Sequence, residues 1–260
     1  MSLETILFEK EANIAIIRLN RPQSLNALNR TMIKELSQVM GDIEEDDEIG
    51  AVIITGSEKF FGAGADIKEI KSLQSPVDVH SFFPASEVMF SKIENLNKPV
   101  IAAISGLSLG GGCELALVCD IRIAAENAIF GLPEITIGVI PAGGGTQRLP
   151  RIVGAGCAKE LLYSGDPIDA MEAFRIGLVN KVTSVEQLLP EAIKLAEKFV
   201  KRPAFALKML KSAVNEGLNM DLKTGLAYEM RCFEVLFSTE DQKEGMNAFV
   251  EKRKAIFKGR

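Results

Sequence analysis

The chain has 260 residues, 47% of them hydrophobic and 25% charged, which suits one large globular domain or one domain with a small appendage. A net charge of −5 does not favour non-specific binding to nucleic acid. The four cysteines form no Cys-x-x-Cys pair and there is one histidine, so neither a zinc site nor a disulfide framework is indicated.

The N-terminus lacks a signal-peptide pattern, and no apolar run reaches ~18 residues without a charge. We therefore expect a cytoplasmic protein that has reduced thiols and does not span a membrane.

The first half of the chain alternates strand and helix patterns. Residues 5–9 and 14–19 are predicted strands, and the next helix begins near residue 29 with an apolar face made of Met32, Ile33, Leu36, Val39 and Met40. A buried strand is predicted over residues 51–55, followed by a glycine-rich loop over 61–66 that enters a helix at Ile67.

The middle of the chain repeats this order. We predict a variable loop over residues 72–84, a helix over about 85–96, a strand over 100–104, a helix over 112–119 and a strand over 121–125. Glycines at 143–145 lead into another helix. The recurring strand, glycine turn and helix indicate an α/β fold of parallel units, coiled as a repeat.

The composition changes near residue 186, after which the chain is helical and rich in Lys and Glu. A short strand is expected near residues 179–182. This divides the chain into a mixed α/β core over residues 1–185, which holds the site, and a helical region over 186–260 that serves as a subdomain or a surface for other subunits.

The segment over residues 101–120 carries the clearest chemistry. An apolar strand leads into three glycines, Gly110 to Gly112, and a carboxylate, Glu114, follows within the next helix. Glycine lets the backbone approach a ligand closely, and the N–H groups at a helix start favour developing negative charge. A second carboxylate, Glu134, follows Pro133. An oxyanion site flanked by two acids suggests acid–base chemistry on a polarised carbonyl.

With these motifs in place, the chain resembles the crotonase family, and within it the short-chain enoyl-CoA hydratases. The resemblance rests on an ordered set of segments that includes LGGGCELA and both glutamates: residues 20–28, 61–69, 98–103, 109–116, 130–135, 144–149, 177–181, 238–246 and 248–254. One glycine-rich piece alone would be weak, but the set covers essentially the whole chain.

The resemblance implies a spiral of β-β-α units followed by helices that build homotrimers, often paired into homohexamers. It implies a hydro-lyase of lipid metabolism that adds water reversibly and syn across the 2,3-double bond of an enoyl-CoA thioester. The resemblance also implies that the reaction needs no metal or redox cofactor. Coenzyme A counts here as part of the substrate. The pathway stays open among fatty-acid β-oxidation, fermentation and aromatic degradation, as does the acyl chain length.

Roles for individual residues follow from the same resemblance. Glu114 would hold the water as general base, Glu134 would exchange a proton with C2 as general acid, and the backbone N–H groups of Ala65 and Gly111 would bind the thioester oxygen. The residues implied to contact the substrate and its CoA part are Ser24, Leu25, Ala27, Ala63, Ala65, Asp66, Ile67, Lys68, Gly111, Phe233, Phe249 and Lys252. The last three could come from a neighbouring subunit.

Two departures from the family pattern are visible. Gln23 stands where many relatives have Lys, which removes one phosphate contact, and residues 141–145 differ slightly from the commoner form, which could change the acyl pocket.

Simpler interpretations exist for single residues. Glu114 and Glu134 could be first-turn acids, and Asp66 is better explained as a helix cap than as a catalyst. Cys113 suits a small core residue and His80 a solvated side chain. Phe233 and Phe249 could equally be core residues.

Alternative functions are an isomerase of the same family, a hydratase for a branched, dienoyl or glutaconyl thioester, an RNA-binding protein, and a non-catalytic assembly subunit. Isomerases of the family generally do not keep both glutamates, so the pair favours hydration. The net charge argues against RNA binding. A non-catalytic subunit could have lost either glutamate, and this chain keeps both.

Overall fold

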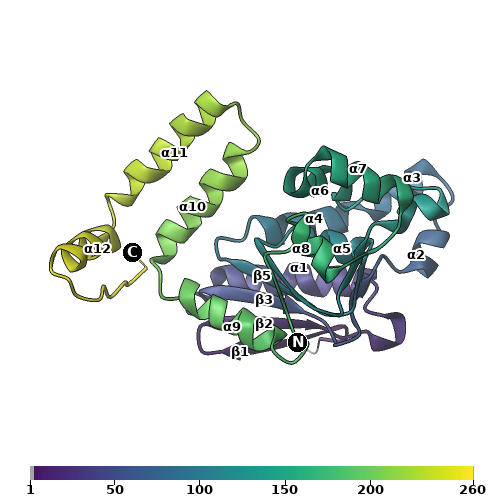
Figure 1. Ribbon diagram of the computed structural model, residues 1–260, viewed down its shortest axis with the longest axis horizontal. Coiled ribbons are helices and arrows are strands. Elements are labelled where there is room, and N and C mark those ends of the chain that lie inside the picture. Colours follow the sequence, from purple (N-terminus) through teal and green to yellow (C-terminus); the bar gives the residue numbers. More distant parts are fainter. Residues whose placement is uncertain (1–2, 260) are drawn as a thin grey trace.

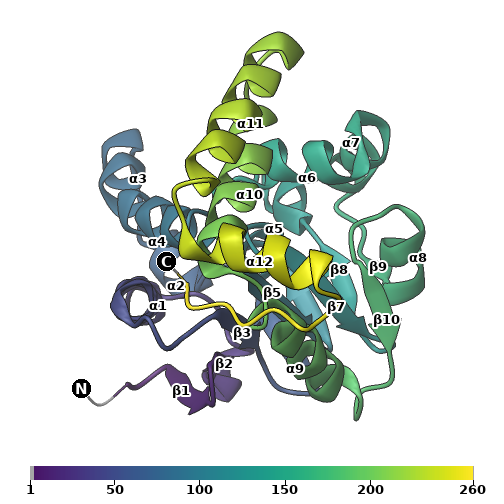
Figure 2. The same cartoon turned by 90° about the vertical axis from the view of Figure 1, so that its left-hand side faces the viewer.

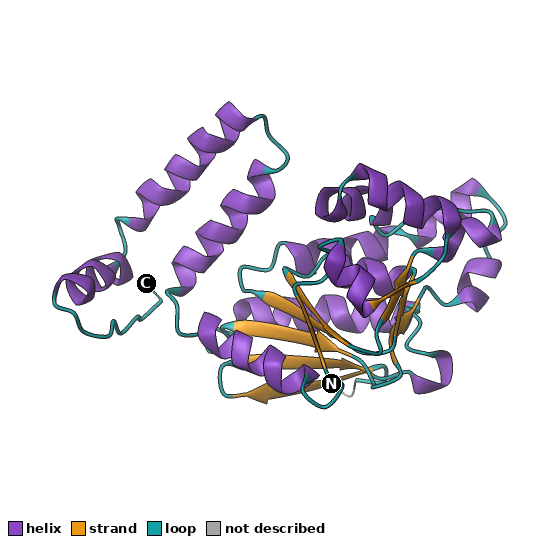
Figure 3. Cartoon of the chain, viewed as in Figure 1, coloured by secondary structure: helices purple, strands orange, loops and turns teal. Residues whose placement is uncertain are grey.

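Two β-sheets form the centre of the computed structural model, which describes residues 3–259 (Figures 1 and 3). The larger sheet contains, in spatial order, β1 (Ile6–Glu11), β2 (Ile14–Leu19), β3 (Ala51–Thr55), β5 (Val100–Ile104), β7 (Ile121–Ala125) and β10 (Lys181–Thr183). The smaller sheet contains β4 (Phe60–Ala63), β6 (Leu107–Leu109), β8 (Ile129–Gly131) and β9 (Ile168–Asp169). Pairing is parallel except at β1–β2 and β8–β9.

The chain winds as a spiral. Each turn adds one strand to the larger sheet, then one to the smaller sheet, and then helical structure: β3 and β4 precede α2, β5 and β6 precede α5, and β7 and β8 precede η2 and α6. The α/β spiral of β-β-α units expected from the sequence is therefore present. Residues of β3 and β5 are buried throughout, which explains why they read as continuous apolar runs.

Helices cover the two sheets. Those before the C-terminal region are α1 (Arg30–Glu45), α2 (Ile67–Lys71), α3 (Pro76–Phe82), α4 (Pro84–Glu94), α5 (Gly111–Leu117), α6 (Gly145–Val153), α7 (Ala155–Ser164) and α8 (Ala170–Arg175), with short 3-10 helices η1 (Pro22–Ser24) and η2 (Pro133–Ile137). The apolar face predicted for α1 is buried, and Asn29 caps this helix by accepting a hydrogen bond from the N–H of Met32.

The C-terminal helices divide between the core and a projecting arm. Helix α9 (Leu188–Phe199) packs Leu188, Ala192 and Ala196 against the larger sheet. The remaining helices are α10 (Ala204–Gly217), α11 (Leu222–Leu236) and α12 (Glu240–Val250), which we call the arm. Helices α10 and α11 lie side by side, and the arm extends away from the sheets (Figures 1 and 2).

Two local predictions are wrong. The variable loop expected over residues 72–84 contains helix α3, which begins with Ser75 as cap and Pro76 in its first turn. The glycine-rich segment over residues 61–66 was expected to be a loop, but its first part belongs to strand β4, because Gly62 and Ala63 pair with Ser108 and Leu109 of β6. These strands are too short to show periodicity in the sequence.

No helix within residues 3–259 is both long enough and apolar enough to cross a membrane.

Candidate active site

The three glycines at the start of α5 allow very close packing of backbone on backbone. Gly110 has φ of 50°, a conformation that L side chains rarely adopt. A Cβ on Gly112 would lie 2.0 Å from the carbonyl oxygen of Gly62 in β4. The triplet therefore brings the N-terminus of α5 directly against the end of β4. At Gly112 the close approach is therefore to protein backbone.

Two backbone N–H groups meet at this junction. A Cβ on Gly111 would lie 3.4 Å from the nitrogen of Ala65, so the two residues are immediate neighbours. The segment around Ala65 is held by Leu28, whose N–H donates to Gly64 O and whose carbonyl accepts from Asp66 N, both at 2.8 Å. Within residues 3–259 the N–H groups of Ala65 and Gly111 donate no hydrogen bond. Paired donors of this kind can stabilise an oxyanion.

Glu114 is buried one turn into α5, with 4% of its surface exposed. Its Oε1 accepts hydrogen bonds from the N–H groups of Gly143 at 2.7 Å and Gly145 at 2.9 Å. Burial raises the pKa of this carboxyl, while the two N–H donors and the nearby positive charge of Arg148 act in the opposite direction. Donors of this kind bind the ionised form, which is the form a general base needs.

Glu134 lies in η2, where its environment differs. Its Oε2 is buried without a hydrogen-bond partner among the described residues, and burial raises the pKa of the carboxyl to about 7, with a further contribution from the charge of Glu114. A Cβ on Gly110 would lie 2.8 Å from Oε1 of Glu134, so this carboxyl stands beside the glycine triplet. A carboxyl that stays protonated near neutral pH can act as a general acid.

The segments expected to contact CoA come together beside this pair of N–H groups. Ala63 N donates to Leu25 O at 3.0 Å, and the side chain of Arg21 joins Asp66 in an ion pair of 2.9 Å while also reaching Ser24. The other members of the set on these segments are Ala27, which is buried, and Ile67 and Lys68, which are exposed at the start of α2.

Phe233, Phe249 and Lys252 do not approach these segments within one chain. They lie on or directly after α11 and α12, on the side of the molecule opposite α2 (Figure 1). Phe233 is 53% and Phe249 84% exposed, so the interpretation of both as core residues of this chain is wrong. Lys252 is exposed too, with φ of 55°.

Other expectations have clear outcomes. Asp66 caps α2 by accepting from Lys68 N, as predicted, and Cys113 is buried, with its thiol pKa raised to about 12 by burial. His80 is exposed on α3.

Sequence reasoning missed the residues that hold the charged groups in place. Arg21 holds Asp66, and Arg148 contacts the loop that binds Glu114. Both arginines lie within segments that carry the family resemblance, and their place in those segments is the one sequence signal that could have identified them.

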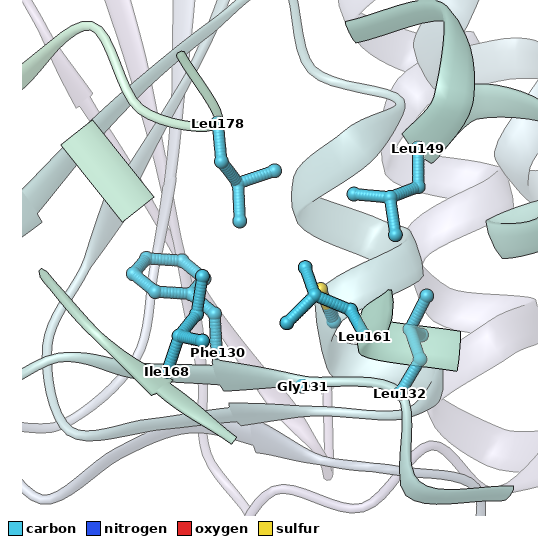
Figure 4. A pocket seen from close by; sticks show the side chains of 8 residues that line it. Phe130, Gly131, Leu132, Leu149, Leu161, Ile168 and Leu178 are labelled. Atoms are coloured by element: carbon cyan, nitrogen blue, oxygen red, sulfur yellow. The ribbon is translucent and has the colours of Figure 1, made fainter. Parts of the chain in front are cut away.

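A small apolar cavity adjoins Cys113 on α5 (Figure 4). It measures about 10 Å³ and is lined by Phe130, Gly131, Leu132, Leu149, Leu161, Ile168 and Leu178. This space is about that of one water molecule and its lining is apolar, so we expect it to stay dry. It is a packing gap and too small for a substrate.

Comparison with known proteins identifies the family. The sequence profile of the Enoyl-CoA hydratase/isomerase family matches residues 9–260. The chain belongs to the enoyl-CoA hydratase/isomerase family. It is 49% identical over 255 residues to a short-chain-enoyl-CoA hydratase of Clostridium acetobutylicum, covering 98% of this chain and 97% of that protein.

A crotonyl-CoA hydratase of Syntrophomonas wolfei is 48% identical over 258 residues, covering 99% of each chain. The crystal structure of an enoyl-CoA hydratase from Bacillus anthracis superposes with a TM-score of 0.94 at 42% identity, covering 99% of this chain and 100% of the other. The predicted family and fold class are thereby confirmed. The roles of individual residues stay predictions, which the geometry above makes specific.

Proposed function

We propose that this member of the enoyl-CoA hydratase/isomerase family is an enoyl-CoA hydratase that adds water to the 2,3-double bond of a short-chain trans-2-enoyl-CoA. One observation carries the proposal: the buried carboxyl of Glu114 and the half-buried carboxyl of Glu134 have opposed environments and stand beside two backbone N–H groups that donate no hydrogen bond within residues 3–259. Glu114 receives two hydrogen bonds, whereas Oε2 of Glu134 receives none from residues 3–259. The names of the relatives from C. acetobutylicum and S. wolfei support the short-chain substrate.

The thioester oxygen binds to the N–H groups of Ala65 and Gly111. When water attacks C3, charge moves through C2 to this oxygen, and the two donors stabilise the resulting enolate-like state. Removing one such donor typically costs about 3 kcal/mol of transition-state stabilisation.

Glu114 and Glu134 divide the proton transfers. The water oxygen bonds to C3 as Glu114 accepts a proton from the water, and C2 takes a proton from Glu134. The thioester carbonyl then reforms, leaving Glu114 protonated and Glu134 ionised until proton exchange restores both. The net change is one water added, with no electron transfer, so no redox cofactor is needed. The two N–H donors supply the polarisation of the carbonyl that a metal ion could otherwise provide.

The CoA part of the substrate lies over residues 24–27 and 63–68 in this proposal. Phe233, Phe249 and Lys252 reach it from the arm of a neighbouring subunit, since the arm of the same chain points away from the site (Figure 1). The arm also exposes large apolar side chains, among them Leu222, Leu226 and Met230, which a homotrimer would cover. A homohexamer would be a pair of such trimers.

The test is loss of the conjugated-thioester absorbance of crotonyl-CoA in water. We expect rapid loss with the wild type, and turnover lower by orders of magnitude for Glu114→Gln and Glu134→Gln, with CoA-thioester binding nearly unchanged. An equal loss of binding in both variants would show that the glutamates are structural. A wild type that binds CoA without hydrating crotonyl-CoA would exclude this substrate and direct attention to longer or branched thioesters and to isomerisation.

A further inference from the structure

Arg148 on α6 connects a carboxylate on α4 with the loop that precedes α6. Its Nε and Nη2 donate to the two carboxylate oxygens of Glu94 on α4, at 2.8 and 2.6 Å. Its Nη1 donates to the carbonyl oxygen of Gly143 at 2.9 Å. The guanidinium is thus held in one orientation by a two-point ion pair and presents its third nitrogen, Nη1, to the loop before α6.

That loop holds Glu114. The N–H groups of Gly143 and Gly145 both donate to Oε1 of Glu114. The carbonyl of Gly143 accepts from Arg148, and Gly144 has φ of 101°, with so little space that a Cβ there would lie 1.9 Å from Nη1 of Arg148. A continuous series of contacts therefore leads from Glu94 through Arg148 and Gly143 to Glu114.

The loop has little freedom on its other side. A Cβ on Gly143 would lie 2.5 Å from Oε2 of Glu114 and 2.6 Å from the ring of Phe90 on α4. The backbone of this loop is thus packed between the carboxylate and α4. A shift of the loop by a fraction of an ångström would move the donors that orient Glu114.

We propose that the Glu94–Arg148 ion pair positions a group for the reaction: it sets the 143–145 loop, and through that loop the orientation of Glu114. This inference rests on the proposed hydratase function, in which Glu114 is the general base. Arg148 acts through Gly143 and is a positioning residue.

The charged surroundings of Glu114 agree with this role. Arg148 on α6 is the positive group that lowers its pKa, and Glu134 on η2 is the negative group that interacts with it. On its own helix the neighbouring thiol of Cys113 stays protonated, and α4 presents the apolar ring of Phe90. Removing the charge of Arg148 would therefore shift the titration of Glu114 to higher pH.

The alternative is that the ion pair merely fastens α4 to α6. Its side chains are 23% and 34% exposed, and water partly screens an ion pair at that exposure, so its contribution to stability is modest even with two-point geometry. Substitution should therefore leave the fold intact, which makes a specific effect on the reaction measurable.

The experiment compares Arg148→Met, Arg148→Lys and Glu94→Gln with Arg151→Met. Arg151 is exposed on the same helix, and among residues 3–259 its side chain bonds only to Gln147, so it is the matched control. We expect Arg148→Met to lower kcat about 10- to 100-fold with KM changed less than threefold, because misplacing a reacting group mainly affects the chemical step. Glu94→Gln should lower kcat less, since Arg148 remains. Arg151→Met should match the wild type.

The pH profile separates positioning from simple destabilisation. Glu114 must be ionised, so activity is lost as the pH falls through its pKa. In Arg148→Met we expect this acidic limb to move up by about one pH unit. Arg148→Lys keeps the positive charge, so the acidic limb of its pH profile should lie close to that of the wild type, while kcat should be only partly restored. An Arg148→Met enzyme with the activity and acidic limb of the control would overturn the proposal.

A crystal structure of the Arg148→Met variant tests the inference independently of any activity measurement. We expect the hydrogen bond from Gly143 N to Glu114 to be broken or displaced, and an unchanged bond would overturn the positioning role. If the wild type fails to hydrate crotonyl-CoA, the proposed function fails, while this structural comparison still decides whether Arg148 positions Glu114.

Discussion

The environment of Glu134 predicts how hydration depends on alkaline pH. Burial, with no hydrogen-bond partner for Oε2 among residues 3–259, raises the pKa of this carboxyl to about 7, above the ordinary value of 4.5. The neutral acid is therefore present below pH 7 in the folded enzyme and is lost as the pH rises through that value. In the proposed mechanism Glu134 donates a proton to C2, so kcat/KM should fall as the pH rises through this value.

The magnitude follows from the titration. With a pKa of about 7, about ten elevenths of Glu134 is protonated at pH 6 and about one eleventh at pH 8. We therefore expect kcat/KM to fall about tenfold between these values, and about tenfold more by pH 9.

The assay is crotonyl-CoA hydration at subsaturating substrate in buffers of constant ionic strength from pH 5.5 to 9. Glu134→Gln is the control, because a glutamine does not titrate and its residual activity should show no limb near pH 7. A wild-type profile that is flat from pH 6 to 8.5, or an unchanged limb in Glu134→Gln, would refute the assignment of Glu134 as the acid.

Three further predictions concern packing, CoA binding and assembly. Gly112→Ala places a Cβ 2.0 Å from Gly62 O and should lower the free energy of unfolding by about 3 kcal/mol, measured by thermal unfolding. The control is Gly156→Ala in α7, where a Cβ would meet nothing within 4 Å, and it should be neutral or stabilising. Similar losses of stability in both variants would contradict the packing argument. Asp66→Asn weakens the ion pair with Arg21 and should raise KM about tenfold with kcat nearly unchanged. A selective loss of kcat would show that Asp66 acts in the chemistry instead. Leu226 and Met230 are each 55% exposed on α11, and the double variant Leu226→Lys with Met230→Lys should have the mass of a single chain in light scattering. An intact oligomer would show that this face is not the interface.

Much of the fold and of the site could be predicted because their determinants are local. The periodicity of Met32, Leu36 and Met40 marks the buried face of α1, and the continuous apolar runs mark β3 and β5. The family resemblance, carried by ordered motifs, indicated the spiral and directed attention to Glu114, Glu134, Ala65 and Gly111.

Only the tertiary structure decided what surrounds these groups. The donors to Glu114 come from a loop about thirty residues further on, and that loop is held by an arginine whose carboxylate partner lies in α4. The strands β4, β6 and β8 are formed by pairing with one another, which three- and four-residue segments cannot show on their own. The identity of Glu114 is a local property of the chain, but its pKa and orientation depend on burial and on distant donors, which exist only once the chain has folded.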